Sequence, residues 1–295
     1  MSLLKTLKQY LPMTALSLAA STLSSQALQE APVYPKLSSM QAVGARIEGL
    51  LAQYPKEDML VLWDIDFTLI LPKEPAFQVH NRIAYKEHLQ SLFRHLDDCT
   101  ASMVINCMTL FPSQLVDAQA PRVIRSLQAQ GIPMIACTAS MAGPLPPYTR
   151  AEAMRFEALK QEGIDFSESF PHHPDLELSG IKGFLQRSPV LYKGILFCNG
   201  LKNNPCKGEA VLGLLDALAV HPKIIIFIDD KEHYLNDMET ALKGHRPETA
   251  FVGIVFTGEM EHKPEAISET EFISVWQGLK NQALGLLQAE SEIAK

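Results

Sequence analysis

The chain has 295 residues, of which 47% are hydrophobic and 20% are charged. This length predicts one or two domains with a large buried core, and the apolar content excludes a disordered or collagen-like chain. The formal net charge of −7 argues against a nucleic-acid-binding protein, because such proteins gain affinity by neutralising phosphates.

Residues 1–27 have the layout of a secretory signal peptide. Lys5 and Lys8 give a positive start, a short apolar stretch follows, and Ser25 and Ala27 stand at the −3 and −1 positions of a cleavage site. The alternative is an ordinary N-terminal helix. We predict export, to the periplasm or as a secreted protein, with no stable membrane span once the signal is removed.

Five cysteines leave at least one unpaired, so the chain is not a disulfide scaffold. Cys198 and Cys206 are separated by a short loop and could be bridged in an oxidising compartment, whereas Cys137 lies in an apolar run and is predicted to be a core residue. The sequence contains no CxxC pair, which argues against a cysteine-based zinc site. We predict that His172 and His173 are loop residues, because no nearby cluster completes a metal site.

Apolar periodicity predicts helices that alternate with buried strands. The predicted elements are a helix at 38–54, a strand at 59–63, an irregular helical stretch at 75–112, a helix at 121–130, a strand at 133–137, a helix at 149–161, a β-like segment at 190–198, a helix at 207–220, a strand at 223–228, a helix ending near 243, a strand at 250–256 and a helix at 268–287. This alternation predicts an α/β fold with a doubly wound, mostly parallel sheet and helices on both faces.

The segment between Leu69 and Thr138 is longer than one crossover, which predicts a small helical cap inserted at 71–115. The catalytic core then comprises 28–70 and 116–295. In open parallel sheets, ligands bind beyond the carboxyl ends of the strands, so reactive residues are expected directly after the apolar runs.

Two acidic pairs follow two of the predicted strands. Asp64 and Asp66 come after the run MLVLW, and Asp229 and Asp230 come after KIIIFI. Carboxylates buried together are unfavourable unless a cation compensates them, and Mg²⁺ binds through a few carboxylates, water and a substrate phosphate. The four acids therefore predict a Mg²⁺ site.

Two further polar groups stand at the ends of predicted elements. Thr138 follows the run PMIAC and offers a hydroxyl donor, and Lys207 places an ammonium near a helix N-terminus, where anions are favoured. Taken singly, Asp66 could be a cap, Thr138 an N-cap and Lys207 a surface lysine. The coincidence of four compensating clusters favours phosphate and metal chemistry.

The run DIDFTL at 64–69 resembles the DxDxT motif of the haloacid dehalogenase-like (HAD) hydrolase superfamily, and the other clusters match its second, third and fourth motifs in order. The sequence is similar to the phosphatase type and, more closely, to an uncharacterised, often exported, bacterial branch. The resemblance implies a three-layer HAD-like Rossmannoid core.

The resemblance also implies a role for each catalytic residue. Asp64 would attack phosphorus to form an aspartyl-phosphate, and Asp66 would protonate the leaving oxygen and then activate water. Thr138 would donate a hydrogen bond to a phosphoryl oxygen, and Lys207 would offset negative charge. Because dehalogenases lack the second acid and ion pumps carry Thr there, Asp66 points to a phosphatase or phosphotransferase.

The implied metal ligands are the side chains of Asp64 and Asp229 and the backbone carbonyl of Asp66, with Asp230 bound directly or through water. Two departures from the family pattern follow. No Arg stands after Thr138, where one is frequent, so Ser140 is a substitute contact. The usual further acid has no obvious position, and Asp237 is the nearest candidate.

The leading hypothesis is a Mg²⁺-dependent phosphomonoester hydrolase that acts on a small phosphorylated substrate or a phosphoprotein. The alternatives are a catalytically inactive member that binds a phospho-ligand or a host protein, and a phosphotransferase. In the predicted cap, Arg82, Lys86, His88 and Arg94 form either an anion-attracting face or an ordinary solvated one.

Overall fold

The computed structural model describes residues 33–200, 207–263 and 265–293, and all of them belong to one compact unit. The predicted signal peptide at 1–27 and the cysteine at position 206 lie outside the described residues. Within the described ranges, no helix is both long enough and apolar enough to cross a bilayer.

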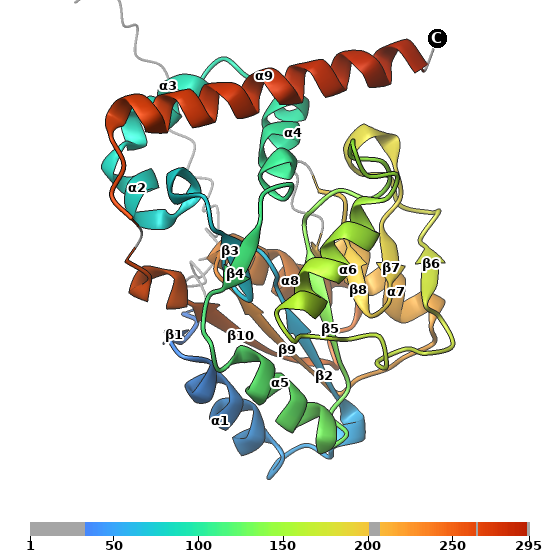
Figure 1. Cartoon of the computed structure of the whole chain (residues 1–295). Coiled ribbons are helices and arrows are strands. Elements are labelled where there is room, and N and C mark those ends of the chain that lie inside the picture. Colours follow the sequence, from blue (N-terminus) through green and yellow to red (C-terminus); the bar gives the residue numbers. More distant parts are fainter. Residues whose placement is uncertain (1–32, 201–206, 264, 294–295) are drawn as a thin grey trace, which may run out of the picture. The chain divides into compact units, whose positions relative to one another are not determined.

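The fold is α/β with a mostly parallel central sheet, as the sequence predicts (Figure 1). In the spatial order of the sheet, the first six strands are parallel to their neighbours, and the last two are added antiparallel. In spatial order the strands are β1 (Lys36–Leu37), β10 (Ala250–Phe256), β9 (Ile224–Asp229), β2 (Met59–Trp63), β5 (Met134–Thr138), β8 (Ile195–Phe197), β7 (Val190–Tyr192) and β6 (Asp175–Glu177).

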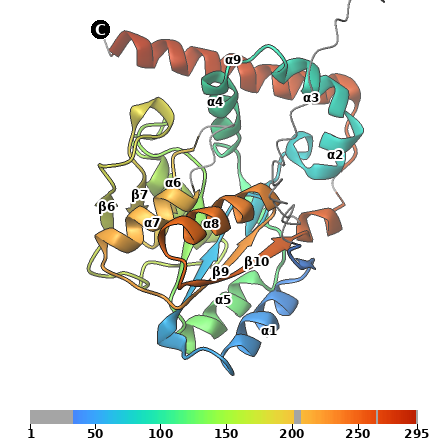
Figure 2. The same cartoon turned by 180° about the vertical axis from the view of Figure 1, so that it is seen from behind.

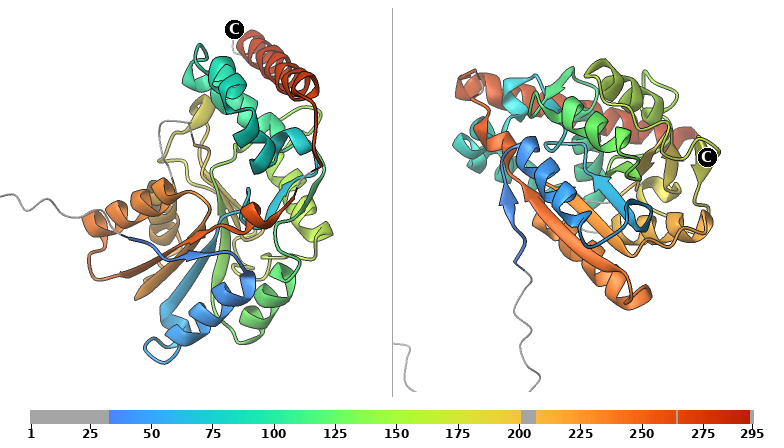
Figure 3. Two further views of the ribbon diagram at one scale, coloured as in Figure 1. Left: turned by 90° about the vertical axis from the view of Figure 1, so that its left-hand side faces the viewer. Right: turned by 90° about the horizontal axis from the view of Figure 1, so that it is seen from below.

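Alternate residues of the central strands enter two buried clusters. Val61 and Trp63 of β2 pack with helices on one face, and Leu60 and Leu62 pack with helices on the other. Figure 1 looks at the first face, Figure 2 looks at the second, and Figure 3 shows α1 and α5 side by side. The helices of the first face are α1 (Met40–Leu50), α5 (Ala120–Ala129) and α6 (Ala151–Gln161), and those of the second are α7 (Lys207–Ala217) and α8 (Glu232–His245).

The order of the strands contains a switch point beside β2. The chain runs from β2 to β5 and β8 on one side, then returns to β9 and β10 on the other. Where strand order reverses in this way, the connections leave in opposite directions and open a crevice at the carboxyl ends. The crevice here lies beyond β2 and β9, the two strands that the acidic pairs follow.

The stretch 75–112 is irregular because it contains several short elements rather than one long helix. The antiparallel strands β3 and β4 pair at the two ends of this stretch and close its base, with Ile70 opposite Leu115. Each of these strands has only three residues, too few for an alternating pattern to show. The elements are β3 (Ile70–Pro72), η2 (Pro75–Phe77), α2 (Val79–Ala84), α3 (Lys86–Phe93), α4 (Asp98–Met108) and β4 (Ser113–Leu115).

The last helix, α9 (Glu269–Ile293), packs against this inserted layer, as Figure 1 shows for α9 and α4. Its buried stripe includes Phe272 and Trp276, and the Trp276 indole Nε1 donates a hydrogen bond of 3.0 Å to the carbonyl of Ala76. The core boundary predicted at 116–295 does not anticipate this packing. The inserted helices and α9 thus form one apolar cluster.

Most predicted elements are present with shifted ends. The first helix begins after Ser39, whose hydroxyl accepts from the Ala42 amide, and the β-like segment at 190–198 is the β7–β8 hairpin. Four short strands, β1, β3, β4 and β6, were not predicted, nor were the short 3₁₀ helices η1 (Lys56–Asp58) and η4 (Gly258–Glu261). A further 3₁₀ turn, η3 (Phe184–Gln186), precedes β7.

Candidate functional site

A sharp turn after β2 places the first acidic pair in the crevice. The amide of Asp64 still donates to the Ile228 carbonyl of β9 at 2.9 Å, so this residue is held by the sheet. Phe67 then adopts a left-handed backbone conformation, with φ of 66°, and its amide donates to Ile70 at 2.8 Å. Such a conformation is unfavourable for a non-glycine residue by roughly 1–2 kcal/mol, and the fixed turn is what aims the acids.

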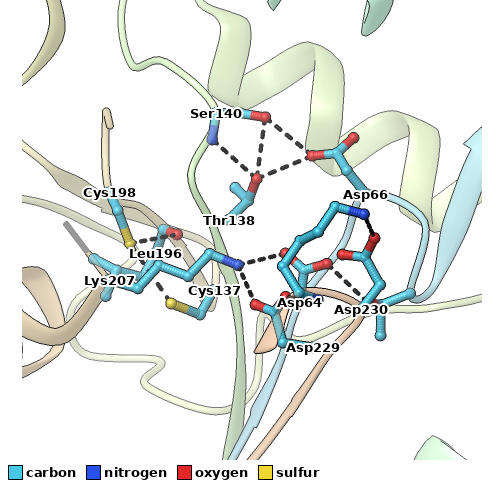
Figure 4. Close-up of polar contacts among 12 residues, drawn as sticks. Asp64, Asp66, Cys137, Thr138, Ser140, Leu196, Cys198, Lys207, Asp229 and Asp230 are labelled. Atoms are coloured by element: carbon cyan, nitrogen blue, oxygen red, sulfur yellow. Dashed lines mark hydrogen bonds and ion pairs between the residues drawn. The ribbon is translucent and has the colours of Figure 1, made fainter. Parts of the chain in front are cut away.

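Lys207 lies between the acids of two strands. Its Nζ is 2.5 Å from Asp64 Oδ1 and 2.7 Å from Asp229 Oδ2, and its side chain is fully buried (Figure 4). Burial alone would lower its pKa, but the charges of Asp229 and Asp64 raise the pKa well above the usual value. Lys207 is therefore a buried cation at the start of α7, and the surface-lysine alternative is wrong.

Three carboxylates form an acidic cluster, in which Lys207 contacts Asp64 and Asp229 and Lys231 contacts Asp230. Asp64, Asp229 and Asp230 offer oxygens that all lie within 4.8 Å of one another. Burial raises the pKa of Asp64 to about 6, and the charges of Asp230 and Asp66 add to that rise while Lys207 opposes it. Burial likewise raises the pKa of Asp229 and of Asp230 to about 7, although each contacts a lysine. The site therefore has more negative charge than its lysines compensate.

Asp66 points away from the cluster, toward the loop after β5 (Figure 4). Its Oδ2 accepts from the hydroxyls of Thr138 and Ser140, both at 3.1 Å, and its Oδ1 accepts from Arg155 Nη2 at 2.5 Å. The side chain is 32% exposed, which leaves it accessible to a ligand. The Asp66 carboxylate is thus placed beside the acidic cluster and outside it, and its predicted metal contact through the backbone carbonyl stays a prediction.

Two residues of the site were not singled out from the sequence. Thr68, the last residue of the DxDxT spacing, donates its hydroxyl to Asp64 Oδ2 at 2.8 Å. Arg155 comes from α6 and reaches Asp66 although its side chain is only 4% exposed. The signal for Arg155 was present, because Ala151, Arg155 and Leu159 follow i, i+4 spacing and share the buried face of the helix.

Ser140 and Asp237 were predicted to take the place of two residues of the HAD motif pattern, and the structure places them differently. Ser140 contacts both Thr138 and Asp66, so it belongs to the site. Asp237 is not in the acidic cluster, because its Oδ2 accepts from the amide of Gly208 at 2.8 Å. This contact satisfies a free amide at the beginning of α7, so Asp237 fixes the helix that carries Lys207.

The four basic residues predicted to form one face of the cap lie in different surroundings. Arg82 is next to the site: it pairs with Glu259 at 3.1 Å, and its guanidinium carbon lies 4.3 Å from the ring centroid of Phe67. Lys86 and Arg94 are exposed, and His88 pairs with the exposed Glu269. Of the four basic residues, Arg82 alone lines the cavity described below.

Two cysteines lie buried beside the site. Cys137 Sγ in β5 is 3.6 Å from Cys198 Sγ, just after β8 (Figure 4). Cys137 is a core residue, as predicted. The exposed His172 and His173 lie in a loop, also as predicted.

A cavity of about 290 Å³ opens over the acidic residues. Its floor includes Asp64, Asp66, Asp230 and Arg155, and its roof is formed by residues of α4 and α9. A ligand in this cavity would meet carboxylates, an arginine and an apolar surface together.

The residues present fit a hard divalent cation. Such ions prefer carboxylate oxygens, and positive charge beyond that of the two lysines would compensate the three acids whose pKa values are raised. Soft ligands are absent from the cluster within the described part of the chain, which argues against a thiolate-bound metal.

Comparison with known proteins identifies the family. A family model described as "Protein of unknown function (DUF2608)" matches residues 36–292. The chain belongs to this DUF2608 family. The match includes the whole sheet, the inserted helices and nearly all of α9.

The relatives of this DUF2608 protein include uncharacterized proteins of Rickettsia. The one from Rickettsia bellii (strain RML369-C) is 24% identical over 216 residues, which cover 72% of this chain and 73% of the relative. One from Rickettsia felis (strain ATCC VR-1525 / URRWXCal2) is 26% identical over 205 residues, which cover 68% of each chain. No solved structure matches the chain.

The raised pKa values predict that Mg²⁺ stabilises this DUF2608 protein more at high pH than at low pH. In the metal-free protein the folded state keeps protons on these acids that the unfolded state has lost. The free energy of unfolding therefore falls as pH rises from about 4 through about 7. Bound Mg²⁺ requires the deprotonated acids and offsets that fall.

The measurement is the melting temperature with Mg²⁺ and with a chelator, at about pH 5 and about pH 8. At a Mg²⁺ concentration about 100 times its Kd, binding adds about 2.7 kcal/mol to the free energy of unfolding. Asp229→Asn should abolish the increase, and Asp216→Asn, at an acid whose side chain is 73% exposed, should preserve it. An increase that is equal at both pH values would contradict the prediction.

Proposed function

We propose that this DUF2608 protein is a Mg²⁺-dependent phosphomonoester hydrolase that acts through an aspartyl-phosphate, with a three-layer HAD-like core and a helical cap at 71–115. The observation that carries the proposal is the buried Lys207, which bridges Asp64 and Asp229 beside the third acid, Asp230.

A purely structural role does not account for this cluster. Burying ions requires a large desolvation penalty to be offset, and a structural ion pair needs one acid for one base. Here three acids meet only two lysines, Lys207 and Lys231, at a strand switch point, and a cavity opens onto them. The placement of unfavourable charge in an accessible crevice supports a site for a ligand.

In the proposed reaction, a carboxylate oxygen of Asp64 attacks phosphorus, and the bond from phosphorus to the ester oxygen breaks. The departing oxygen takes a proton from Asp66 and leaves as an alcohol. Asp66 then accepts a proton from water as that water attacks the aspartyl-phosphate, which releases phosphate and restores Asp64. The position of Asp66, partly exposed and separate from the acidic cluster, suits a group that exchanges protons.

The residues that would hold Mg²⁺ are Asp64, Asp229 and Asp230, with the backbone carbonyl of Asp66. Bound Mg²⁺ would supply positive charge that stabilises the phosphoryl oxygens. Lys207 holds Asp64 in a fixed orientation and compensates its charge, and Thr68 fixes the other oxygen of the same carboxylate. The nucleophile is thereby oriented before a substrate arrives.

Arg155 and Thr138 are the proposed phosphoryl contacts. Within the described residues, the Nε of Arg155 is buried without a hydrogen-bond partner, and the residue lines the cavity. A guanidinium presents a fork of donors that matches phosphate oxygens. Arg155 would thus supply the phosphoryl contact that an arginine in the loop after β5 supplies in related phosphatases, although Arg155 comes from helix α6.

The sequence of residues 1–27 supports the further proposal that the enzyme is exported to the periplasm or secreted. Its substrate is proposed to be a phosphorylated small molecule or a phosphoprotein.

Asp64→Asn should lower the hydrolysis of 4-nitrophenyl phosphate by at least roughly 10³-fold, since it removes the nucleophile. Asp66→Asn should behave differently. Nitrophenolate can leave without a proton, so the aspartyl-phosphate still forms, but its hydrolysis lacks the base that activates water. We expect the Asp66 variant to accumulate a phosphoenzyme that is stable in acid, located at Asp64 by mass spectrometry.

Asp216→Asn serves as the matched control and should retain activity. Tight phosphate binding without turnover of any phosphoester would contradict the proposal and favour a non-catalytic binding protein. Transfer of the phosphoryl group mainly to an added alcohol would instead indicate a phosphotransferase.

Arg155→Met should raise both KM and the inhibition constant of inorganic phosphate by roughly ten- to a hundredfold, because a charge-assisted contact is lost. Arg155→Lys should recover part of that loss. The measurement is inhibition by phosphate, with Arg122→Met at the exposed surface of α5 as the control. An inhibition constant unchanged in Arg155→Met would contradict a phosphoryl contact.

A further inference from the structure

The cavity over the acidic cluster has an apolar roof that the hydrolysis of a phosphate group does not require. Six of the large apolar residues that line the cavity come from three segments far apart in the sequence. These residues are Phe67, Leu71, Ile105, Met108, Phe111 and Trp276. The same cavity is lined by Asp66, the proposed acid for the leaving oxygen, so the apolar surface and Asp66 face one space.

The size of the cavity leaves room for more than a phosphoryl group. An apolar cavity of about 150 Å³ accommodates a benzene ring, and this cavity measures about 290 Å³. Ile105 has 47% of its surface exposed although its side chain is apolar and lines the cavity. Such exposed apolar surface in a concave site is typical of a ligand contact.

The polar side chains of the roof are engaged within the protein. Asn106 accepts from the Met141 amide at 2.8 Å and donates to the Ser102 carbonyl at 2.9 Å, and Thr109 donates to the Asn106 carbonyl at 2.6 Å. The indole nitrogen of Trp276 donates to a backbone carbonyl. The roof therefore offers few free groups to the hydroxyls of a sugar.

We infer that the substrate is a small phosphate monoester of an aromatic or otherwise apolar alcohol, and that α4 and α9 bind the alcohol. This inference rests on the proposed function, since the leaving group can occupy the roof only if phosphorus is attacked from Asp64. Against α4 and α9, the hydroxyls of a polyhydroxylated ester would lose hydrogen bonds to water and gain few in return.

The test compares 2-phenylethyl phosphate with glycerol 3-phosphate, since both release an alkyl alcohol and neither is activated chemically. We expect kcat/KM to be roughly tenfold or more higher for the phenylethyl ester, because a phenyl ring leaves water. Ile105→Ser should reduce this preference, measured as the ratio of the two kcat/KM values, by roughly three- to tenfold. Ile273→Ser, at an exposed isoleucine of α9 outside the cavity lining, should change neither value.

Hydrolysis of both esters at equal efficiency would overturn the inference and leave the phosphatase proposal intact. A phosphotyrosyl peptide hydrolysed faster than phenyl phosphate would overturn the assignment to a small ester.

Binding of phosphonates separates the two proposals, because it does not depend on turnover. In the presence of Mg²⁺, 2-phenylethylphosphonate should bind roughly tenfold or more tightly than methylphosphonate, and Ile105→Ser should remove most of the difference. Equal binding of the two phosphonates would overturn the apolar subsite, whether or not any ester is hydrolysed. If the preference holds and no ester is hydrolysed, the phosphatase proposal fails and the apolar subsite stands.

Discussion

The structure of the site depends on one buried ammonium group held between carboxylates of two adjacent strands. Lys207 contacts Asp64 beyond β2 and Asp229 at the end of β9, and these strands are neighbours because the chain reverses its winding beside β2. Without Lys207, Asp64 and Asp229 would be left together in a desolvated crevice beside Asp230, which is strongly unfavourable. The buried charges and the reversal of strand order therefore occur at the same point of the sheet, between β2 and β9.

The inserted helices are tied to this place by hydrogen bonds as well as apolar packing. The paired strands β3 and β4 begin within a few residues of Asp66, and Asn106 of α4 accepts from the amide of Met141, close to Thr138 and Ser140. Because α9 packs on α4, the C-terminal end of the chain contributes to the roof of the cavity. The helices over the cavity and the loop that contacts Asp66 are thus one connected structure.

The sequence was sufficient for the features that depend on local pattern. Continuous apolar runs such as 59–63 and 223–228 identify buried strands, and the residues directly after them are those that line the crevice. The positions of Asp64, Asp229 and Lys207 in one cluster follow from strand order, which a single parallel α/β pattern restricts to few arrangements.

Other features depend on contacts between distant segments and were missed. Arg155 reads as one more charged residue of a helix until α6 is placed against the sheet, and Asp237 reads as a candidate acid until its contact with the Gly208 amide is seen. The three-residue strands β3 and β4 have no pattern of their own and form only because the cap returns to its starting point. The packing of α9 on the cap likewise requires knowledge of where the cap lies.

The central claim is that the acidic cluster holds a divalent cation in front of Asp64. Anomalous diffraction from crystals soaked in Mn²⁺, which shares the oxygen preference of Mg²⁺, tests it most directly. We expect a single strong peak within about 2.5 Å of oxygens of Asp64 and Asp229, beside Asp230, with Lys207 still in place. No peak there at neutral pH in wild-type crystals, or an equal peak in Asp229→Asn, would contradict it.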